Sequence, residues 1–327
     1  MNQEIKIKYK SLMAIYLIIP LAFLVILVDT FFLNKFLLNN YLHFSPVSFA
    51  IWTLIFGLPH IVGGLITMAD KEYLVHYKNQ LFFSIPLIVL FVILAPKAFG
   101  EDLFILIFWA ATMYHVIAQQ LGLAMMMAEG KRGAHFLLWK ITCVTVGFLG
   151  FYMINNDLLN WEYQIIGGKY YNRCFFLMLF IYGCSCYFFF RILKGAKTQL
   201  GVLNLWANQI MIGSALISIH TYYFSFVIII LRVIHDYTAF FIYTAHECNR
   251  NTENHKKLIY KLFQRGPLFN GVLFLILSFL LASLIDFKGN KVVVTIAFSV
   301  SFLHYYLEGF IWKGPNPHRK KIYFLKS

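Results

Sequence analysis

Residues 12–34 read LMAIYLIIPLAFLVILVDTFFLN, an apolar run in which Asp29 is the one charged side chain. An α-helix of about 20 such residues crosses the hydrocarbon core of a bilayer. Similar runs recur along the whole chain, whereas the alternating ten-residue strands of an outer-membrane barrel do not. This pattern predicts an all-α fold, a polytopic bundle of transmembrane helices.

The composition agrees with a membrane protein. Of the 327 residues 60% are hydrophobic and 13% are charged, too few polar side chains to cover a soluble surface. The net charge of +14 is spread over short loops and tails, which favours anionic lipid headgroups as partners and argues against nucleic acid. The high Ile, Lys, Phe, Tyr and Asn content is typical of an AT-rich bacterial genome. We therefore expect a multi-pass protein of the bacterial inner membrane.

About ten transmembrane segments are expected, in one integral membrane domain covering residues 1–327. Their predicted ranges are 12–34, 47–68, 80–97, 103–127, 135–155, 172–194, 202–219, 223–246, 267–286 and 292–313. Basic residues gather before the first segment and after the fourth, sixth, eighth and tenth, so both tails, 1–11 and 314–327, are predicted to be cytoplasmic. A single bent segment around His220 would give nine crossings instead.

Four histidines lie inside apolar segments, and each is on an even-numbered one. They are His60, His115, His235 and His304. Each lies twelve or thirteen residues from the predicted start of its segment. At about 1.5 Å of rise per residue, and with all four segments running in the same direction, these histidines reach a similar depth. They are predicted to form one layer near the middle of the membrane.

Further polar side chains lie within four residues of these histidines. They are Gln119, Arg232, Asp236 and Glu308. Such groups cost several kcal/mol each in hydrocarbon unless they face one another, an ion or water. Imidazole and carboxylate together are the ligand set of iron, manganese and zinc sites. We therefore predict that the four histidines bind metal, with Glu308, Gln119 and Asp236 as catalytic groups that ligate, accept protons or support the ligands.

Simpler interpretations exist for single residues. One intramembrane histidine can merely hydrogen-bond a neighbouring helix, and Arg232 with Asp236 can form an internal ion pair. Gln120 lies on a different helical face from Gln119 and is expected to hydrogen-bond another helix. Solvated positions near interfaces or in tails are expected for His43, His76, His135, His255 and His318.

The motif Gly57-Leu58-Pro59-His60, followed by Tyr114-His115 and His235, resembles the Brp/Blh family of bacterial membrane β-carotene oxygenases. The resemblance implies that His60, His115 and His235 bind iron, with His304 as a fourth candidate, and that the iron cleaves a carotenoid with dioxygen. The chain differs from the family pattern at Ile61 and Ala239, and it has no HxxxH pair.

Three functional hypotheses follow. The first is a membrane-embedded oxygenase with one or two iron ions, acting with dioxygen on a long lipid-soluble substrate such as a carotenoid or acyl lipid. The second is a transporter or channel that uses the same histidines and acids to relay protons or metal ions. The third is a membrane electron carrier with haem held between two histidines. Zinc is an alternative metal for these ligands.

Overall fold

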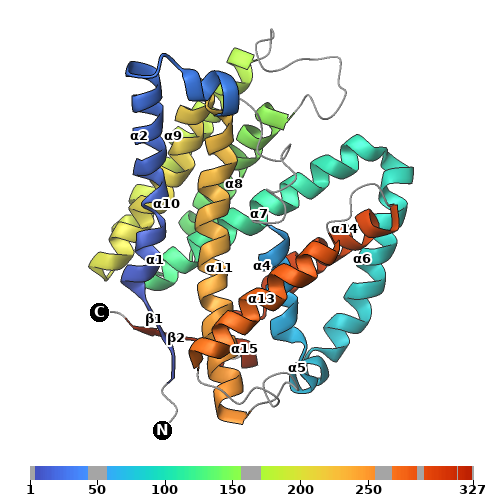
Figure 1. The fold of residues 1–327 in the computed structure, drawn as a ribbon. Helices are drawn as coiled ribbons and strands as arrows, with labels where there is room; N and C mark the ends of the chain where they lie inside the picture. The colour runs from blue at the N-terminus through green and yellow to red at the C-terminus, as the bar shows by residue number, and fades with distance from the viewer. Residues whose placement is uncertain are drawn as a thin grey trace. The chain divides into compact units, whose positions relative to one another are not determined.

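The computed structural model describes residues 4–42, 57–155, 171–254, 267–285, 291–314 and 316–325. Over these residues the fold is all-α, with one two-stranded sheet (Figure 1). The chain divides into two compact units. Unit 1 comprises Met1–Ser11, Phe49–Phe108 and Asp236–Ser327, and unit 2 comprises Leu12–Ser48 and Trp109–His235. The prediction of a single domain is not tested by this division.

Each predicted apolar segment coincides with a helix where it is described. The corresponding helices are α1 (Tyr9–Ile15) with α2 (Ile18–Phe31), α4 (Leu58–Met68), α6 (Lys78–Phe99), α7 (Glu101–Met127), α8 (Ala134–Asn155), α9 (Tyr171–Leu193), α10 (Gln199–His220), α11 (Phe224–Asn254), α13 (Pro267–Ile285) and α14 (Lys291–Glu308). The seventh and eighth predicted segments are separate helices, because α10 ends at His220 and Tyr222 in the link to α11 has a positive φ of 66°. Shorter elements are β1 (Lys6–Lys8), η1 (Leu38–Leu42), α5 (Lys71–His76), α15 (Pro317–Lys320) and β2 (Tyr323–Leu325).

Seven spans among the described residues are long and apolar enough to cross a membrane. They are Tyr9–Phe31, Lys78–Phe99, Glu101–Met127, Ala134–Ile154, Tyr171–Leu193, Gln199–His220 and Phe224–Asn251. Three apolar helices are shorter as described: Leu58–Met68, Gly271–Ser283 and Val292–Glu308. These helices support a multi-pass membrane protein, while the count of ten crossings and the cytoplasmic position of both ends stay predictions.

The outer surface of α6 shows why lipid is the expected solvent. Phe82 and Phe83 are 73% and 65% exposed, and Leu87 is 63% exposed. The opposite side of the helix buries Val92 and Ala95. A helix with large apolar side chains on its exposed face suits hydrocarbon, not water.

Within unit 1, α4 packs against α13 and α14, and α14 also packs against α6 (Figure 1). Aromatic rings fill the contact between α6 and α14, since Phe91 of α6 meets Phe302 of α14 with centroids 5.5 Å apart. This packing holds α4 and α14, which carry His60 and His304, against each other.

The two chain ends of unit 1 pair with each other. Strands β1 and β2 are parallel, with Ile7 opposite Phe324. Asn249 of α11 contacts the segments next to both strands. Its side chain accepts a hydrogen bond from the Ile5 amide (2.7 Å) and donates one to the Lys321 carbonyl (2.9 Å). Described parts of the segments expected as tails, residues 4–11 and 316–325, are therefore joined to α11 through Asn249.

Unit 2 is built on α8, α9 and α10, which pack against one another. The buried Gln209 of α10 joins all three helices. It accepts a hydrogen bond from the Trp139 indole of α8 (2.7 Å) and donates to the Ser185 hydroxyl of α9 (2.9 Å). In an apolar environment such side-chain hydrogen bonds between helices fix their register.

Candidate metal centre

Helix α4 begins at the GLPH motif, and this start positions His60. Gly57 has a φ of 94°, a left-handed conformation that favours glycine, and it precedes the first helical residue, Leu58. Pro59 then lies in the first turn, where its missing N–H leaves no intrahelical hydrogen bond broken. The motif therefore starts a helix and carries His60 into the interior, where it is 0% exposed.

A carboxylate on α11 accompanies His60. The Nδ1 atom of His60 lies 3.1 Å from Oδ1 of Asp236. The other oxygen of Asp236 accepts a hydrogen bond from the Gly57 amide at 3.2 Å. A carboxylate beside one nitrogen of a metal-binding histidine fixes the orientation of the ring and raises the basicity of the other nitrogen. The predicted catalytic residue Asp236 thus contacts His60 and the start of α4.

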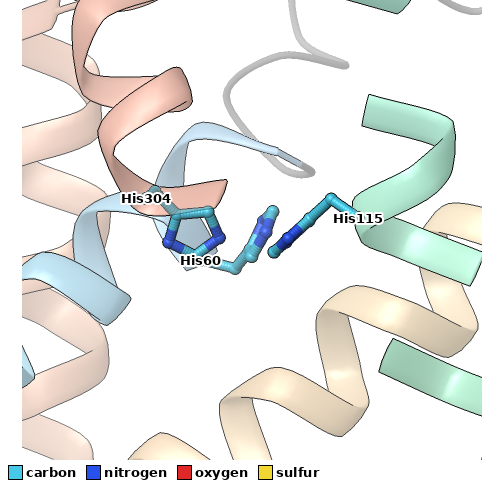
Figure 2. A group of neighbouring side chains, drawn as sticks. All are labelled: His60, His115 and His304. Atoms are coloured by element: carbon cyan, nitrogen blue, oxygen red, sulfur yellow. The ribbon is translucent and has the colours of Figure 1, made fainter. Parts of the chain in front are cut away.

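The second histidine of unit 1 packs directly on the glycines of α4. A Cβ atom at Gly64 would lie 2.7 Å from Nδ1 of His304, so an alanine there would displace the ring. The His60 and His304 rings are 5.0 Å apart at 82°, and nitrogen atoms of the two lie within 4.8 Å of each other. Figure 2 shows these two imidazoles side by side. The third histidine drawn there, His115, belongs to unit 2.

The predicted partner of His304 is also in place. Oε2 of Glu308 lies 3.7 Å from Nε2 of His304, one helical turn away. Oε1 of the same carboxylate accepts hydrogen bonds from the Tyr243 hydroxyl and from the Trp312 indole, the latter at 2.9 Å. Sequence patterns assigned no role at the site to Tyr243 or Trp312, because neither is itself a usual metal ligand.

The remaining two histidines form a pair within unit 2. The ring centroids of His115 on α7 and His235 on α11 are 5.0 Å apart, at an interplanar angle of 76°. Both side chains are buried, with exposures of 5% and 0%. All four histidines are thus buried, and the prediction that they share one site stays a prediction.

The predictions for the polar residues near the histidines are met in one case and untested in the others. Gln120 accepts a hydrogen bond from the Tyr16 hydroxyl (3.2 Å), which confirms its predicted helix-linking role. Gln119 is half-buried and Arg232 is buried. The catalytic role predicted for Gln119 and the ion pair predicted between Arg232 and Asp236 stay predictions.

The interpretation of His318 as a solvated tail residue is wrong. His318 is 0% exposed, because α15 folds back and stacks this ring on Tyr73 (3.9 Å) and on His246 (5.0 Å). His76 and His135 are exposed as expected. His43 and His255 lie outside the described residues.

Buried histidine and carboxylate side chains of this chain could hold a metal ion. Comparison with known proteins adds no assignment, because no protein-family model, curated protein or solved structure matches the chain. The resemblance to the Brp/Blh family therefore still rests on its short motifs.

Proposed function

We propose that this protein is a membrane-embedded, iron-dependent oxygenase that acts on a long lipid-soluble substrate such as a carotenoid or an acyl lipid. The observation that carries the proposal is the buried contact between His60 and His304, each with a carboxylate beside it. These four side chains are at most 4% exposed, in a chain whose outer helices present apolar side chains.

The donor set supports a metal ion. Two histidines and a carboxylate with open coordination positions are the ligands of many non-haem iron oxygenases. His60, His304 and Glu308 supply such a set, and Asp236 orients His60. Buried polar groups of this kind cost several kcal/mol each unless they face one another, an ion or water, and a metal ion would stabilise this set. The sequence prediction adds His115 and His235 as further ligands.

The proposed substrate class follows from the apolar surroundings of the site and from the metal ion that its side chains would hold. A bound iron ion supplies activation of dioxygen, and a dry apolar surrounding limits side reactions with water. Side chains of this chain would hold the iron, exclude water and admit a substrate that is dissolved in lipid. The family resemblance supports a carotenoid or a related polyene.

Ring geometry argues against haem held by either histidine pair. Axial histidines lie on opposite faces of a haem, with the iron between their nitrogens. The rings of His60 and His304 are instead in edge-to-face contact at 5.0 Å, and those of His115 and His235 have the same spacing. Contacting rings leave no room for a porphyrin between them.

The test is metal content and the optical spectrum of the full chain purified in detergent. We compare wild type with His60→Ala, His304→Ala and His115→Ala, and use the exposed His76→Ala as the matched control. Stoichiometric iron without a Soret band, lost in the first two variants and retained in the control, is the expected result. Retention of iron in His115→Ala would remove that residue from the ligand set.

Absence of bound metal from well-folded wild-type protein, after incubation with iron(II) and zinc(II), would refute the proposal. A proton relay through the same side chains would then explain the buried groups better. Once iron is found, oxygen consumption with a carotenoid and with an acyl lipid separates the two substrate classes.

A further inference from the structure

The two carboxylate oxygens of Glu308 have different surroundings. Oε1 accepts two hydrogen bonds, from the Tyr243 hydroxyl and from the Trp312 indole nitrogen. Oε2 faces Nε2 of His304 at 3.7 Å. One oxygen is therefore held by donors from α11 and from the segment after α14, while the other is directed to the candidate metal ligand.

The first donor, Tyr243, is fixed by its packing on α4. It is 1% exposed, and a Cβ atom at Gly63 or at Gly64 would lie 3.3 Å from its ring or from its hydroxyl. The glycines of the GLPHIVGG stretch thus make room for both His304 and Tyr243. This close packing limits movement of the phenol ring and keeps its hydroxyl beside Glu308.

The second donor, Trp312, is fixed by a cluster of aromatic rings. Its indole stacks on Tyr243 at 5.7 Å and 23°. His246 and His318 contact it edge to face, at 5.7 Å and 5.4 Å. The C-terminal segment that brings His318 here therefore supports the position of the indole nitrogen.

We propose that Tyr243 and Trp312 are positioning residues that hold Glu308 so that Oε2 alone is presented to the metal. Glu308 then binds through one oxygen, together with His304 and His60. Without the two donors, the carboxylate would be free to rotate about its terminal bond and to bind through either oxygen or both. This inference rests on the proposed metal site and adds the residues that set its carboxylate geometry.

The experiment uses cobalt(II) as the probe, because its visible spectrum reports coordination number and geometry. The variants Tyr243→Phe and Trp312→Phe each remove one donor and retain an aromatic ring. Tyr306→Phe, at a 43% exposed position on α14, is the matched control. Cobalt(II) affinity, the bound spectrum and the thermal unfolding midpoint of the metal-free protein are measured for the full chain.

Loss of a hydrogen-bonding partner behind a metal ligand typically lowers metal affinity by about 10- to 100-fold. We expect each donor variant to lose affinity in this range and to change the cobalt spectrum. The unfolding midpoint should fall modestly, because one buried hydrogen bond to a carboxylate is removed. Unchanged affinity and spectrum in both variants, with cobalt lost in His304→Ala, would overturn the inference and leave the metal site standing.

Two further outcomes are decisive. An affinity loss in which the cobalt that still binds keeps the wild-type spectrum would show a merely structural role and overturn the inference. Absence of cobalt binding in wild type, together with absence of iron, would overturn the inference and the proposed function at the same time.

Discussion

Unit 1 contains two clusters of buried histidines, and the angle between the histidine rings differs between them. In the first cluster, His60 and His304 meet edge to face at 82°, each beside a carboxylate. In the second cluster, His246 and His318 stack in nearly parallel planes at 10°. His246 also contacts the Tyr73 hydroxyl through Nε2 at 3.0 Å.

The angle between the rings decides what each cluster can bind. The nitrogen lone pair of an imidazole lies in the ring plane, and a metal ion must sit about 2.0–2.1 Å from each nitrogen. Planes that cross at 82° can direct two lone pairs to one point, whereas parallel stacked planes cannot. Burial of a histidine and a carboxylate beside it are therefore insufficient evidence of a metal site, since Nδ1 of His246 also lies 3.3 Å from Oε1 of Glu247. The angle between the rings separates the two clusters.

The largest effect is expected at Gly64, which belongs to the first cluster. In Gly64→Ala the new methyl group would lie 2.7 Å from Nδ1 of His304 and would displace that ring. We expect metal affinity to fall by about 100-fold or more, since a ligand is moved and its support is disturbed. Isothermal titration of the metal-free protein with iron(II) measures this change.

The control for this substitution is Gly183→Ala on α9. A Cβ atom at Gly183 meets nothing within 4 Å, so metal affinity and stability should stay close to wild type. Equal metal affinity in the two alanine variants would contradict the assignment of His304 as a ligand.

In the second cluster we expect a substitution to lower stability and to leave metal affinity almost unchanged. His318→Ala removes a fully buried ring that stacks on Tyr73 and His246. Such a cavity lowers the free energy of unfolding by about 2–4 kcal/mol. Metal affinity should change by less than tenfold, because Tyr243 and His246 still contact Trp312. Thermal unfolding and metal titration of the same sample give both values.

If His318→Ala loses its metal while its stability is retained, the distinction between the two clusters fails. The second cluster would then contain ligands, and the stacking angle would have to change on metal binding.

The smallest effect concerns Tyr77, at the edge of the second cluster and just before α6. Burial raises the pKa of the Tyr77 hydroxyl to about 12. Burial favours the neutral hydroxyl in the folded state. The stability that this preference contributes is fully present below the unfolded pKa of about 10 and is lost as the pH rises through the folded pKa of about 12. Tyr77→Phe removes this pH dependence.

The Tyr77 hydroxyl is buried and has no hydrogen-bond partner among the described residues. Removing it should therefore leave stability at pH 8 unchanged or raise it by up to about 1 kcal/mol. Unfolding midpoints of wild type and Tyr77→Phe between pH 8 and 11 test both statements. A loss of stability at pH 8 would show that the hydroxyl has a partner in solution.

The sequence by itself determined the helices and the candidate ligands. Long apolar runs leave the backbone no solvent with which to hydrogen-bond, so each run must satisfy its own amides as a helix. For the same reason a histidine in such a run must find a polar partner, which made His60 and His304 recognisable. The spacing of four residues also placed Glu308 next to His304, because that spacing is local to one helix.

Tertiary structure decided the partners that come from distant parts of the chain. Asp236 reaches His60 across 176 positions, and the Trp312 indole that donates to Glu308 is packed by Tyr243, His246 and His318. His318 looked like a solvated tail residue, since a short polar segment has no periodicity that reveals where it folds. Contacts of this kind depend on how helices pack against one another, which apolar patterning alone does not encode.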